Sequence, residues 1–175
     1  MPTHALAADV HAKLRAFPDF PTPGIRFQDI APVLADPALR PRVIDALAAP
    51  SAGRVDKVAG IESRGFTLGA PVALRLGVGF VPLRKRGKLP GPTLVEPYAL
   101  EYGEAALEAQ ADAFAPGDRV LIVDDVLATG GTAGAAARIV ARAGGRVDAF
   151  AFLLEIAALG GRAKLAAPAT ILASM

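Results

Sequence analysis

Two adjacent carboxylates and the small-residue loop behind them are the part of the chain best suited to chemistry. Asp124 and Asp125 follow the apolar run Val120–Val123, which is typical of a strand buried on both faces, and we expect the strand to end at this acidic pair. Residues 128–132, Ala-Thr-Gly-Gly-Thr, come next, and residues 133–143 then predict a helix that a glycine pair ends. The stretch therefore predicts a strand, two acids, a loop and a helix in direct succession.

The loop is a natural site for an anion, because it would lie at the carboxyl end of a parallel strand and open a helix. Gly130 and Gly131 let the backbone approach a ligand closely, and Thr129 and Thr132 add hydroxyl donors. The two carboxylates would repel a phosphate at contact, so we expect them to meet sugar hydroxyls or a metal-bound water. A phosphate in the loop and a diol on the carboxylates together describe a ribose 5-phosphate.

A plainer interpretation is that two aspartates end a strand and cap a helix, with Gly-Gly as an ordinary turn. The complete string VLIVDDVLATGGT is far more specific than either dipeptide alone. It is not a Walker loop, because no Gly-Lys-Ser or Gly-Lys-Thr follows the glycines, and their spacing does not fit a dinucleotide-binding fingerprint.

The composition narrows the class of protein. At 175 residues the chain is long enough for one domain with a good core. No apolar run reaches the length of a membrane span, and the N-terminus lacks a signal-peptide pattern. Cysteine is absent and there are 2 histidines, which argues against thiol catalysis, disulfides and a histidine metal cluster. A net charge of +2 is too small to indicate a nucleic-acid surface. We expect a cytoplasmic α/β domain that binds neither nucleic acid nor membrane.

Hydrophobic periodicity and breaker residues predict the elements that must position the acidic pair and its loop. We expect helices over residues 5–16, 37–49, 66–76, 104–114, 133–143 and 159–165. We expect strands over residues 55–61, 78–83, 120–123, 147–154 and 169–173, the last at an edge of the sheet.

Basic side chains follow two of the predicted strands. Arg64 lies in the polar loop after the strand at 55–61, and the run RKRGK occupies residues 84–88 after the strand at 78–83. A run of charge is usually a solvated surface, and a single arginine often is as well. Because both lie at the sheet edge that should carry the acidic pair, we interpret them as ligands for an anion.

Two segments lack a regular pattern. In the segment Phe17–Ile30, three prolines and Gly24 rule out a regular helix over Pro18–Gly24, although residues 25–28 can form a short extended piece. This segment either packs its aromatic side chains on the core or forms a small hood over a ligand, and its chemistry alone does not choose between them. The long stretch at 84–103 has the features of a mobile lid.

The motifs FPDFPTPG, GIESRGF, RKRGKLPGPT, LEYG and VLIVDDVLATGGT occur in this order. Together, over about residues 17–165, they resemble the type I phosphoribosyltransferases, and the last is similar to their phosphoribosyl pyrophosphate signature. The first and fourth look particular to the adenine-specific branch. The resemblance implies an α/β fold with a mostly parallel sheet flanked by helices. It also implies one domain over residues 1–175, with a small N-terminal hood at about 17–30 and a flexible catalytic loop at about 84–103.

The resemblance implies that adenine and 5-phosphoribosyl 1-pyrophosphate give AMP and pyrophosphate, in purine salvage. Mg²⁺ would be carried by the donor, with no metal held directly by protein side chains, and family members are usually homodimers. One alternative is an enzyme for a 6-oxopurine, against which the adenine-type hood argues. The other is a non-catalytic regulator that senses phosphoribosyl pyrophosphate. Against it, the chain has no room for an added DNA-binding domain, and the basic and LEYG segments would be unexplained.

The resemblance also assigns roles residue by residue. The two aspartates would bind the ribose hydroxyls and stabilise positive charge at the anomeric carbon, and Glu101 would exchange a proton with the base. The catalytic groups are therefore Glu101, Asp124 and Asp125. The groups implied for the 5-phosphate are Ala128, Thr129, Gly130, Gly131 and Thr132. The groups implied for pyrophosphate are Arg64, Lys85 and Lys88.

The remaining assignments are less direct. Tyr102 would reach the reacting centre together with Glu101 when the flexible loop closes. The resemblance leaves open whether Arg84 or Arg86 also binds pyrophosphate, and whether one of them acts from a partner subunit. Arg26 and Gln28 would hold adenine, mainly through their backbone. The family commonly has arginine at the second of these positions and an apolar residue at the first, so affinity changes if side chains make the contact.

Overall fold

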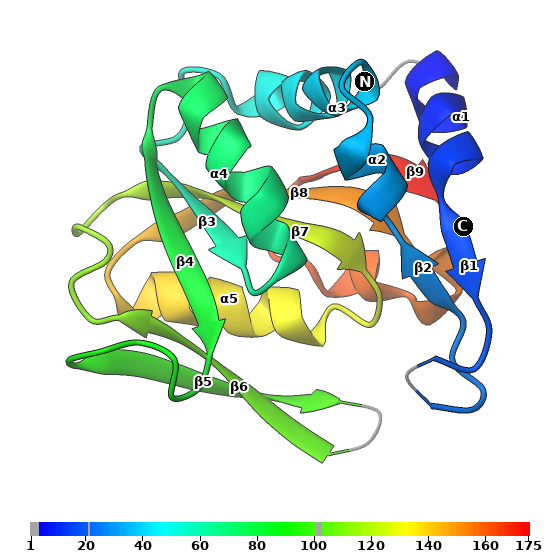
Figure 1. The fold of residues 1–175 in the computed structure, drawn as a ribbon. Helices are drawn as coiled ribbons and strands as arrows, with labels where there is room; N and C mark the ends of the chain where they lie inside the picture. Colours follow the sequence, from blue (N-terminus) through cyan, green and yellow to red (C-terminus); the bar gives the residue numbers. More distant parts are fainter. Residues whose placement is uncertain (1–3, 21, 101–102) are drawn as a thin grey trace.

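The computed structural model describes residues 4–20, 22–100 and 103–175. A seven-stranded sheet runs through its centre in the order β5-β6-β4-β3-β7-β8-β9, and a separate two-stranded sheet is made by β1 and β2 (Figure 1). The strands are β1 (Arg15–Phe17), β2 (Phe27–Asp29), β3 (Lys57–Ile61), β4 (Gly79–Lys85), β5 (Thr93–Leu100), β6 (Gly103–Gln110), β7 (Arg119–Leu127), β8 (Arg146–Glu155) and β9 (Ala169–Ser174). The helices are α1 (His4–Lys13), α2 (Ala31–Ala35), α3 (Leu39–Ala48), α4 (Arg64–Leu76) and α5 (Gly131–Arg142), with short 3₁₀ turns η1 (Ala49–Ser51), η2 (Ala157–Leu159) and η3 (Gly161–Lys164).

Five adjacent strands of the seven-stranded sheet are parallel. β4, β3, β7, β8 and β9 pair in parallel in this order, whereas β6 joins β4 in the antiparallel sense and β5 joins β6 in the same way. Parallel strands need crossover helices, and these helices cover both faces of the sheet. The predicted α/β class with a mostly parallel sheet flanked by helices is confirmed.

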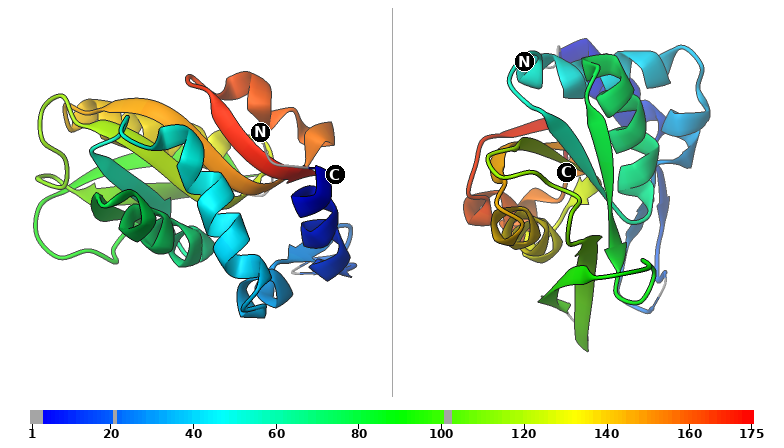
Figure 2. Two further views of the ribbon diagram at one scale, coloured as in Figure 1. Left: turned by 90° about the horizontal axis from the view of Figure 1, so that it is seen from above. Right: turned by 90° about the vertical axis from the view of Figure 1, so that its left-hand side faces the viewer.

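Alternate side chains of β7 fill two separate hydrophobic clusters. Leu121 and Val123 pack with α1 to α4 on one face, and Val120 and Ile122 pack with α5 on the other. All four are at most 1% exposed, which explains why the strand reads as a continuous apolar run. The right-hand view of Figure 2 shows α4 and α5 on opposite sides of the sheet.

The prediction of a helix over residues 104–114 is wrong. Gly103–Gln110 forms β6, which pairs along its length with β5 from Leu100↔Gly103 to Thr93↔Gln110. The local sequence GEAALEAQ favours a helix by intrinsic propensity, but pairing with β5 and, at Leu107 and Glu108, with β4 overrides that preference, as does the burial of Leu107 and Ala109. Much of the stretch at 84–103 is consequently strand rather than irregular lid, and its mobility stays a prediction.

Smaller differences concern the ends of elements. The first helix ends at Lys13 and is followed by β1, which pairs antiparallel with β2 as the hood. The short helix α2 was not expected, and the region at 159–165 forms two 3₁₀ turns rather than one helix. β9 lies at the sheet edge, as predicted. Within the described ranges, no helix combines the length and apolar character that a membrane span requires.

Candidate active site

A cleft of about 410 Å³ opens at the carboxyl ends of β3, β4 and β7, under the hood. It is lined by hood residues 25–28, by residues 61–64 after β3, by Lys85, and by Asp124 and Asp125. Ligands of open parallel sheets bind at this edge because the loops that follow the strands converge there. The structure thus brings two of the predicted anion ligands, Arg64 and Lys85, into one space with the predicted acids and the hood.

The loop at 128–132 borders a smaller adjoining cavity of about 60 Å³. Gly130 precedes α5 with φ of 81°, a backbone conformation that favours glycine, and it has no side chain to cap the helix. The first-turn N–H groups of α5 therefore face the cavity without a side-chain acceptor from that position. This arrangement, with the positive end of the helix dipole, suits a phosphate.

The 3₁₀ turn η3 packs directly against this loop. A Cβ atom on Gly161 would lie 2.2 Å from the Ala128 carbonyl oxygen and 2.9 Å from the Gly130 nitrogen. The turn is fastened by Glu155, which is 6% exposed and accepts hydrogen bonds from Arg162 Nη2 at 2.7 Å and Nε at 3.2 Å. The shape of the loop at 128–132 consequently depends on Gly161, which lies 31 positions after Gly130 in the sequence.

The acidic pair lies inside β7, which continues to Leu127, so the prediction that the strand ends at these residues is wrong. Register pairing with β8 carries the strand on, from Asp124↔Phe152 to Leu127↔Glu155. Asp125 is 5% exposed, and its backbone N–H donates a hydrogen bond of 2.9 Å to Asp124 Oδ1. Burial, and then the neighbouring charge of Asp125, raise the pKa of Asp124 well above its ordinary value.

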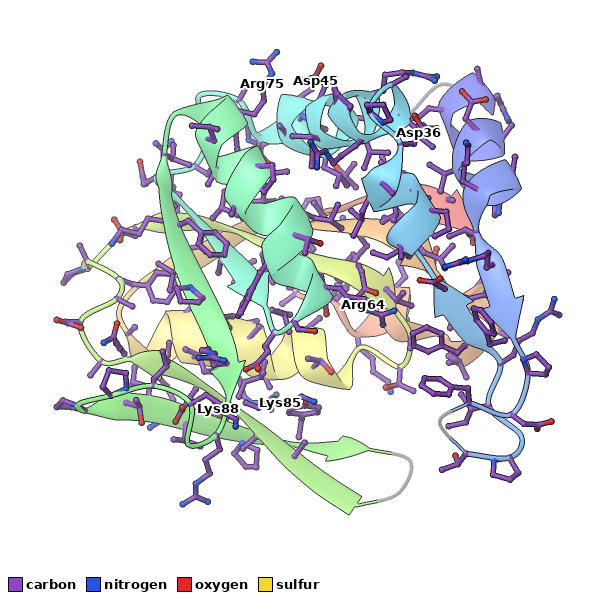
Figure 3. All side chains as sticks on the ribbon, in the orientation of Figure 1. Asp36, Asp45, Arg64, Arg75, Lys85 and Lys88 are labelled. Atoms are coloured by element: carbon purple, nitrogen blue, oxygen red, sulfur yellow. The ribbon has the colours of Figure 1, made fainter. Side chains whose placement is uncertain are left out.

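Arg64 connects the acidic pair with the hood. Its Nε lies 2.8 Å from Asp125 Oδ2, its guanidinium carbon lies 4.8 Å from the centre of the Phe27 ring, and its Nη1 donates to the Gln28 carbonyl at 3.4 Å. The buried Asp125 Oδ2 nevertheless lacks a hydrogen bond of good geometry from any described residue. A sugar hydroxyl would supply the missing donor. Figure 3 shows Arg64 between the start of α4 and the hood.

The basic run divides into groups with different surroundings. Arg84 Nε and Nη2 each lie 3.3 Å from a Glu62 carboxylate oxygen, and Arg84 Nη1 donates to the Lys88 carbonyl at 3.1 Å. Arg84 is therefore engaged within the protein. Lys85, Arg86 and Lys88 are exposed, and only Lys85 lines the cleft among these three.

The cleft holds most of the predicted site residues. Its lining and that of the adjoining cavity include Arg26, Gln28, Arg64, Lys85, Asp124, Asp125, Ala128, Thr129, Gly130, Gly131 and Thr132. Glu101 and Tyr102 lie outside the described residues. Sequence reasoning did not single out Phe27, Glu62, Tyr98 and Ile156, which also line the cleft. An aromatic residue in the hood and the acid beside Arg64 were available signals for the first two.

The parallel sheet, the helix-opening loop and the acidic pair on the central strand define a class of enzyme. Residues 42–166 match the family described as phosphoribosyl transferase domain, and the chain belongs to this family. Its curated relatives are adenine phosphoribosyltransferases. That of Acidothermus cellulolyticus is 54% identical over 176 residues, covering 100% of this chain and 98% of the relative. That of Myxococcus xanthus is 59% identical over 161 residues, covering 91% and 88%.

Solved structures of similar chains point to the same branch. The adenine phosphoribosyltransferase of Rhodothermus marinus superposes with a TM-score of 0.93 at 50% identity and covers 98% of this chain and 99% of its own. The enzyme of Giardia lamblia complexed with 9-deazaadenine gives 0.91 at 42% identity, covering 97% of both. The Trypanosoma brucei enzyme, solved with AMP, pyrophosphate and ribose-5-phosphate, gives 0.90 at 25% identity and covers 99% and 81%.

Proposed function

We propose that the chain transfers the phosphoribosyl group of 5-phosphoribosyl 1-pyrophosphate to N9 of adenine, giving AMP and pyrophosphate in purine salvage. The observation that carries the proposal is that one cleft joins the hood, Arg64 and the acidic pair, next to a helix-opening phosphate loop. Relatives at 54% and 59% identity, named for this activity, support the same conclusion.

The donor would lie along the edge of the sheet. Its 5-phosphate enters the loop at 128–132, where backbone N–H groups at the start of α5 receive it. Its ribose hydroxyls donate to Asp124 and Asp125, which satisfies the buried Asp125 Oδ2. Its pyrophosphate then extends toward Arg64, Lys85 and Lys88, whose charges suit a polyanion.

The acceptor would lie under the hood. Arg26, Phe27 and Gln28 line that side of the cleft, and Gln28 is 8% exposed. Because Arg26 is exposed, the contacts that hold adenine come mainly from the backbone of Arg26 and Gln28, with Phe27 as an apolar surface. A backbone group is fixed as donor or acceptor, so it distinguishes the amino group of adenine from the carbonyl of hypoxanthine or guanine.

Breaking the bond between ribose and pyrophosphate builds positive charge on the sugar. The acidic pair is placed to stabilise that charge, since Asp124 and Asp125 belong to the rigid central strand. Glu101, brought to the base by the segment at 84–103, would exchange a proton with a ring nitrogen and so help N9 to attack.

Mg²⁺ fits this site as an ion that arrives bound to the donor. Carboxylate oxygens suit Mg²⁺, but the described residues contain no group of three or more histidine, cysteine or acidic side chains that could hold a metal. The ion would therefore be bound mainly by the oxygens of the donor, near Asp124 and Asp125. When bound, it neutralises negative charge on the departing pyrophosphate.

A comparison of three purines as substrates tests the proposal. Adenine, hypoxanthine and guanine are each supplied with phosphoribosyl pyrophosphate and Mg²⁺, and the released pyrophosphate is measured. A mismatched buried group costs about 1–3 kcal/mol, so kcat/KM for adenine should exceed the others by tens-fold or more. Comparable values for hypoxanthine would overturn the adenine assignment. Calorimetric binding of the donor with no turnover of any base would instead favour the regulator.

A further inference from the structure

Glu108 is a buried carboxylate that lies outside the cleft. It belongs to β6, faces Arg84 across the β4–β6 pairing, and is 3% exposed. Its Oε1 accepts hydrogen bonds from the backbone N–H groups of Lys88 at 2.7 Å and Leu89 at 2.8 Å. A carboxylate this deeply buried is unfavourable unless such donors satisfy it. The partners of Glu108 are thus the backbone of the turn that carries the basic run.

The same turn is held from its other side by Glu62. Glu62 Oε2 accepts a hydrogen bond of 2.8 Å from the Lys85 backbone N–H, and Glu62 forms the ion pair with Arg84. Arg84 in turn donates to the Lys88 carbonyl. Two carboxylates therefore fasten the backbone of residues 85–89 at both of its ends.

These carboxylates accept hydrogen bonds from backbone amides of the turn and not from its ammonium groups. Within residues 4–20, 22–100 and 103–175, no carboxylate forms an ion pair with Lys85 or Lys88. Figure 3 shows both lysines at the end of β4 that borders the site. Among the described residues, the turn thus presents Lys85 and Lys88 without a carboxylate partner, and a polyanion is the ligand that this arrangement suits.

The charge state of Glu108 agrees with this geometry. Burial alone raises its pKa, but hydrogen bonds from the backbone of Leu89, Gly87 and Lys88 and from Thr93 outweigh burial. The pKa therefore lies below its ordinary value, and the side chain is ionised at neutral pH. The ionised carboxylate is the form that accepts the two short hydrogen bonds from the Lys88 and Leu89 amides.

We propose that Glu108 is a positioning residue for the pyrophosphate of the donor. By holding the Lys88 and Leu89 amides, it fixes where the turn presents Lys88 before the donor arrives, so the donor does not have to order the turn. Glu62 fixes Lys85 in the same way. The inference rests on the proposed function, because it assumes that the polyanion at this turn is the pyrophosphate of the donor.

The experiment compares Glu108→Gln with Glu96→Gln, a matched change on the neighbouring strand β5. Glu96 pairs with Arg138 and Arg142 of α5 and does not touch the turn. Calorimetry measures the binding of phosphoribosyl pyrophosphate and of AMP to each variant, and steady-state assays give KM and kcat. Glu108→Gln should weaken donor binding and raise its KM about tenfold, with AMP binding unchanged, because only the donor carries pyrophosphate. Glu96→Gln should bind both ligands normally.

A double-mutant cycle with Lys88→Ala separates positioning from general stabilisation. If Glu108 acts through Lys88, the double variant binds the donor no more weakly than the worse single variant. Additive losses, or equal losses of donor and AMP binding, would overturn the inference. If Glu108→Gln does not fold, Glu108→Asp serves as the second variant. It keeps the negative charge but moves the carboxylate away from the Lys88 and Leu89 amides, and it should weaken binding of the donor without weakening binding of AMP. Calorimetry needs no turnover, so failure of the proposed function appears separately, as a wild-type protein that binds the donor without using adenine.

Discussion

Asp124 is a carboxyl group whose surroundings disfavour its charge while the site is empty. Burial and the adjacent Asp125 both raise its pKa, and Arg64 offsets this only in part. The ligand-free protein therefore tends to keep a proton on the pair. A bound sugar that develops positive charge reverses the balance, because the full negative charge of the pair then becomes favourable.

A variant that cannot ionise tests this account. Below the ordinary aspartate pKa of about 3.9, Asp124 is protonated in both the folded and the unfolded chain. Above it, the unfolded chain releases the proton while the folded chain retains it, so folding stability is lost until pH passes the raised pKa. Asp124→Asn removes this loss. The Tm of the ligand-free variant should gain on that of the wild type as pH rises from about 4 to neutral.

The control is Asp112→Asn on the exposed turn after β6. Its Tm difference from wild type should stay nearly constant over the same range of pH. A Tm difference for Asp124→Asn that did not grow with pH would contradict the raised pKa. Its kcat should fall in any case, because the charge that stabilises the sugar is gone.

Glu101→Gln tests the predicted proton transfer. General acid–base catalysis contributes roughly 10²–10⁴ in rate, so kcat should drop by that order while AMP binding and Tm change little. A stopped turnover assay measures kcat, calorimetry measures AMP binding, and thermal unfolding measures Tm. A variant within a few-fold of wild type would assign the proton transfer to water or to another group.

The chemistry of single residues was more predictable than their contacts. Asp124, Asp125 and the loop behind them could be singled out as candidates because the roles predicted for them depend on residue type and on order along the chain. Two contacts depend on segments that are distant in sequence: that of Arg64 with the Phe27 ring and the ion pair of Arg84 with Glu62. No local pattern reports such contacts, and they become visible only when the strands are placed side by side.

At the scale of elements, the phosphate loop and the η2–η3 turn form one packed unit. Gly161→Ala should deform this unit, because the added Cβ would lie 2.2 Å from the Ala128 carbonyl oxygen. We expect AMP affinity to fall by about tenfold, which is ~1.4 kcal/mol, and stability to fall by about 1–3 kcal/mol. Calorimetry and chemical denaturation measure the two effects.

Gly79→Ala is the matched control, since its Cβ would meet Lys57 at 3.6 Å, an ordinary contact distance. It should leave AMP affinity unchanged. Normal AMP affinity in Gly161→Ala would show that the turn can move away without disturbing the phosphate loop.

Elements with a distinct burial pattern were predicted well, and elements made by pairing were not. Local hydrophobic periodicity predicts the buried run of β7 and the apolar stripes of α3 and α4. The strand β6 is rich in alanine and glutamate and reads as a helix, because its stabilisation comes from β4 and β5 rather than from its own sequence. The hood strands β1 and β2 have 3 residues each, too few for alternation to show.

At the scale of the whole molecule, we predict a homodimer in which Arg86 completes the site of the partner. Arg84 is engaged by Glu62, whereas Arg86 is exposed and thus the better candidate for an action across subunits. Sedimentation should give twice the chain mass of 17.9 kDa. Arg86→Ala and Asp124→Asn should each be nearly inactive, yet mixing them should restore activity, because a hybrid contains one complete site. No recovery would place Arg86 within its own subunit, and a monomeric mass would exclude the dimer.

The hood is a sheet of its own, built from residues 15–29, whereas the family match begins at residue 42. If the hood holds the base as we propose, the choice of acceptor is encoded in these two short strands, apart from the sheet that would bind the sugar and its phosphates. Substitutions in the hood strands, natural or engineered, can then change the base without changing the residues of the sheet that would carry out the transfer. Phe27 is a position at which a change in the hood would reach the acidic pair, because the Arg64 guanidinium lies over its ring and pairs with Asp125.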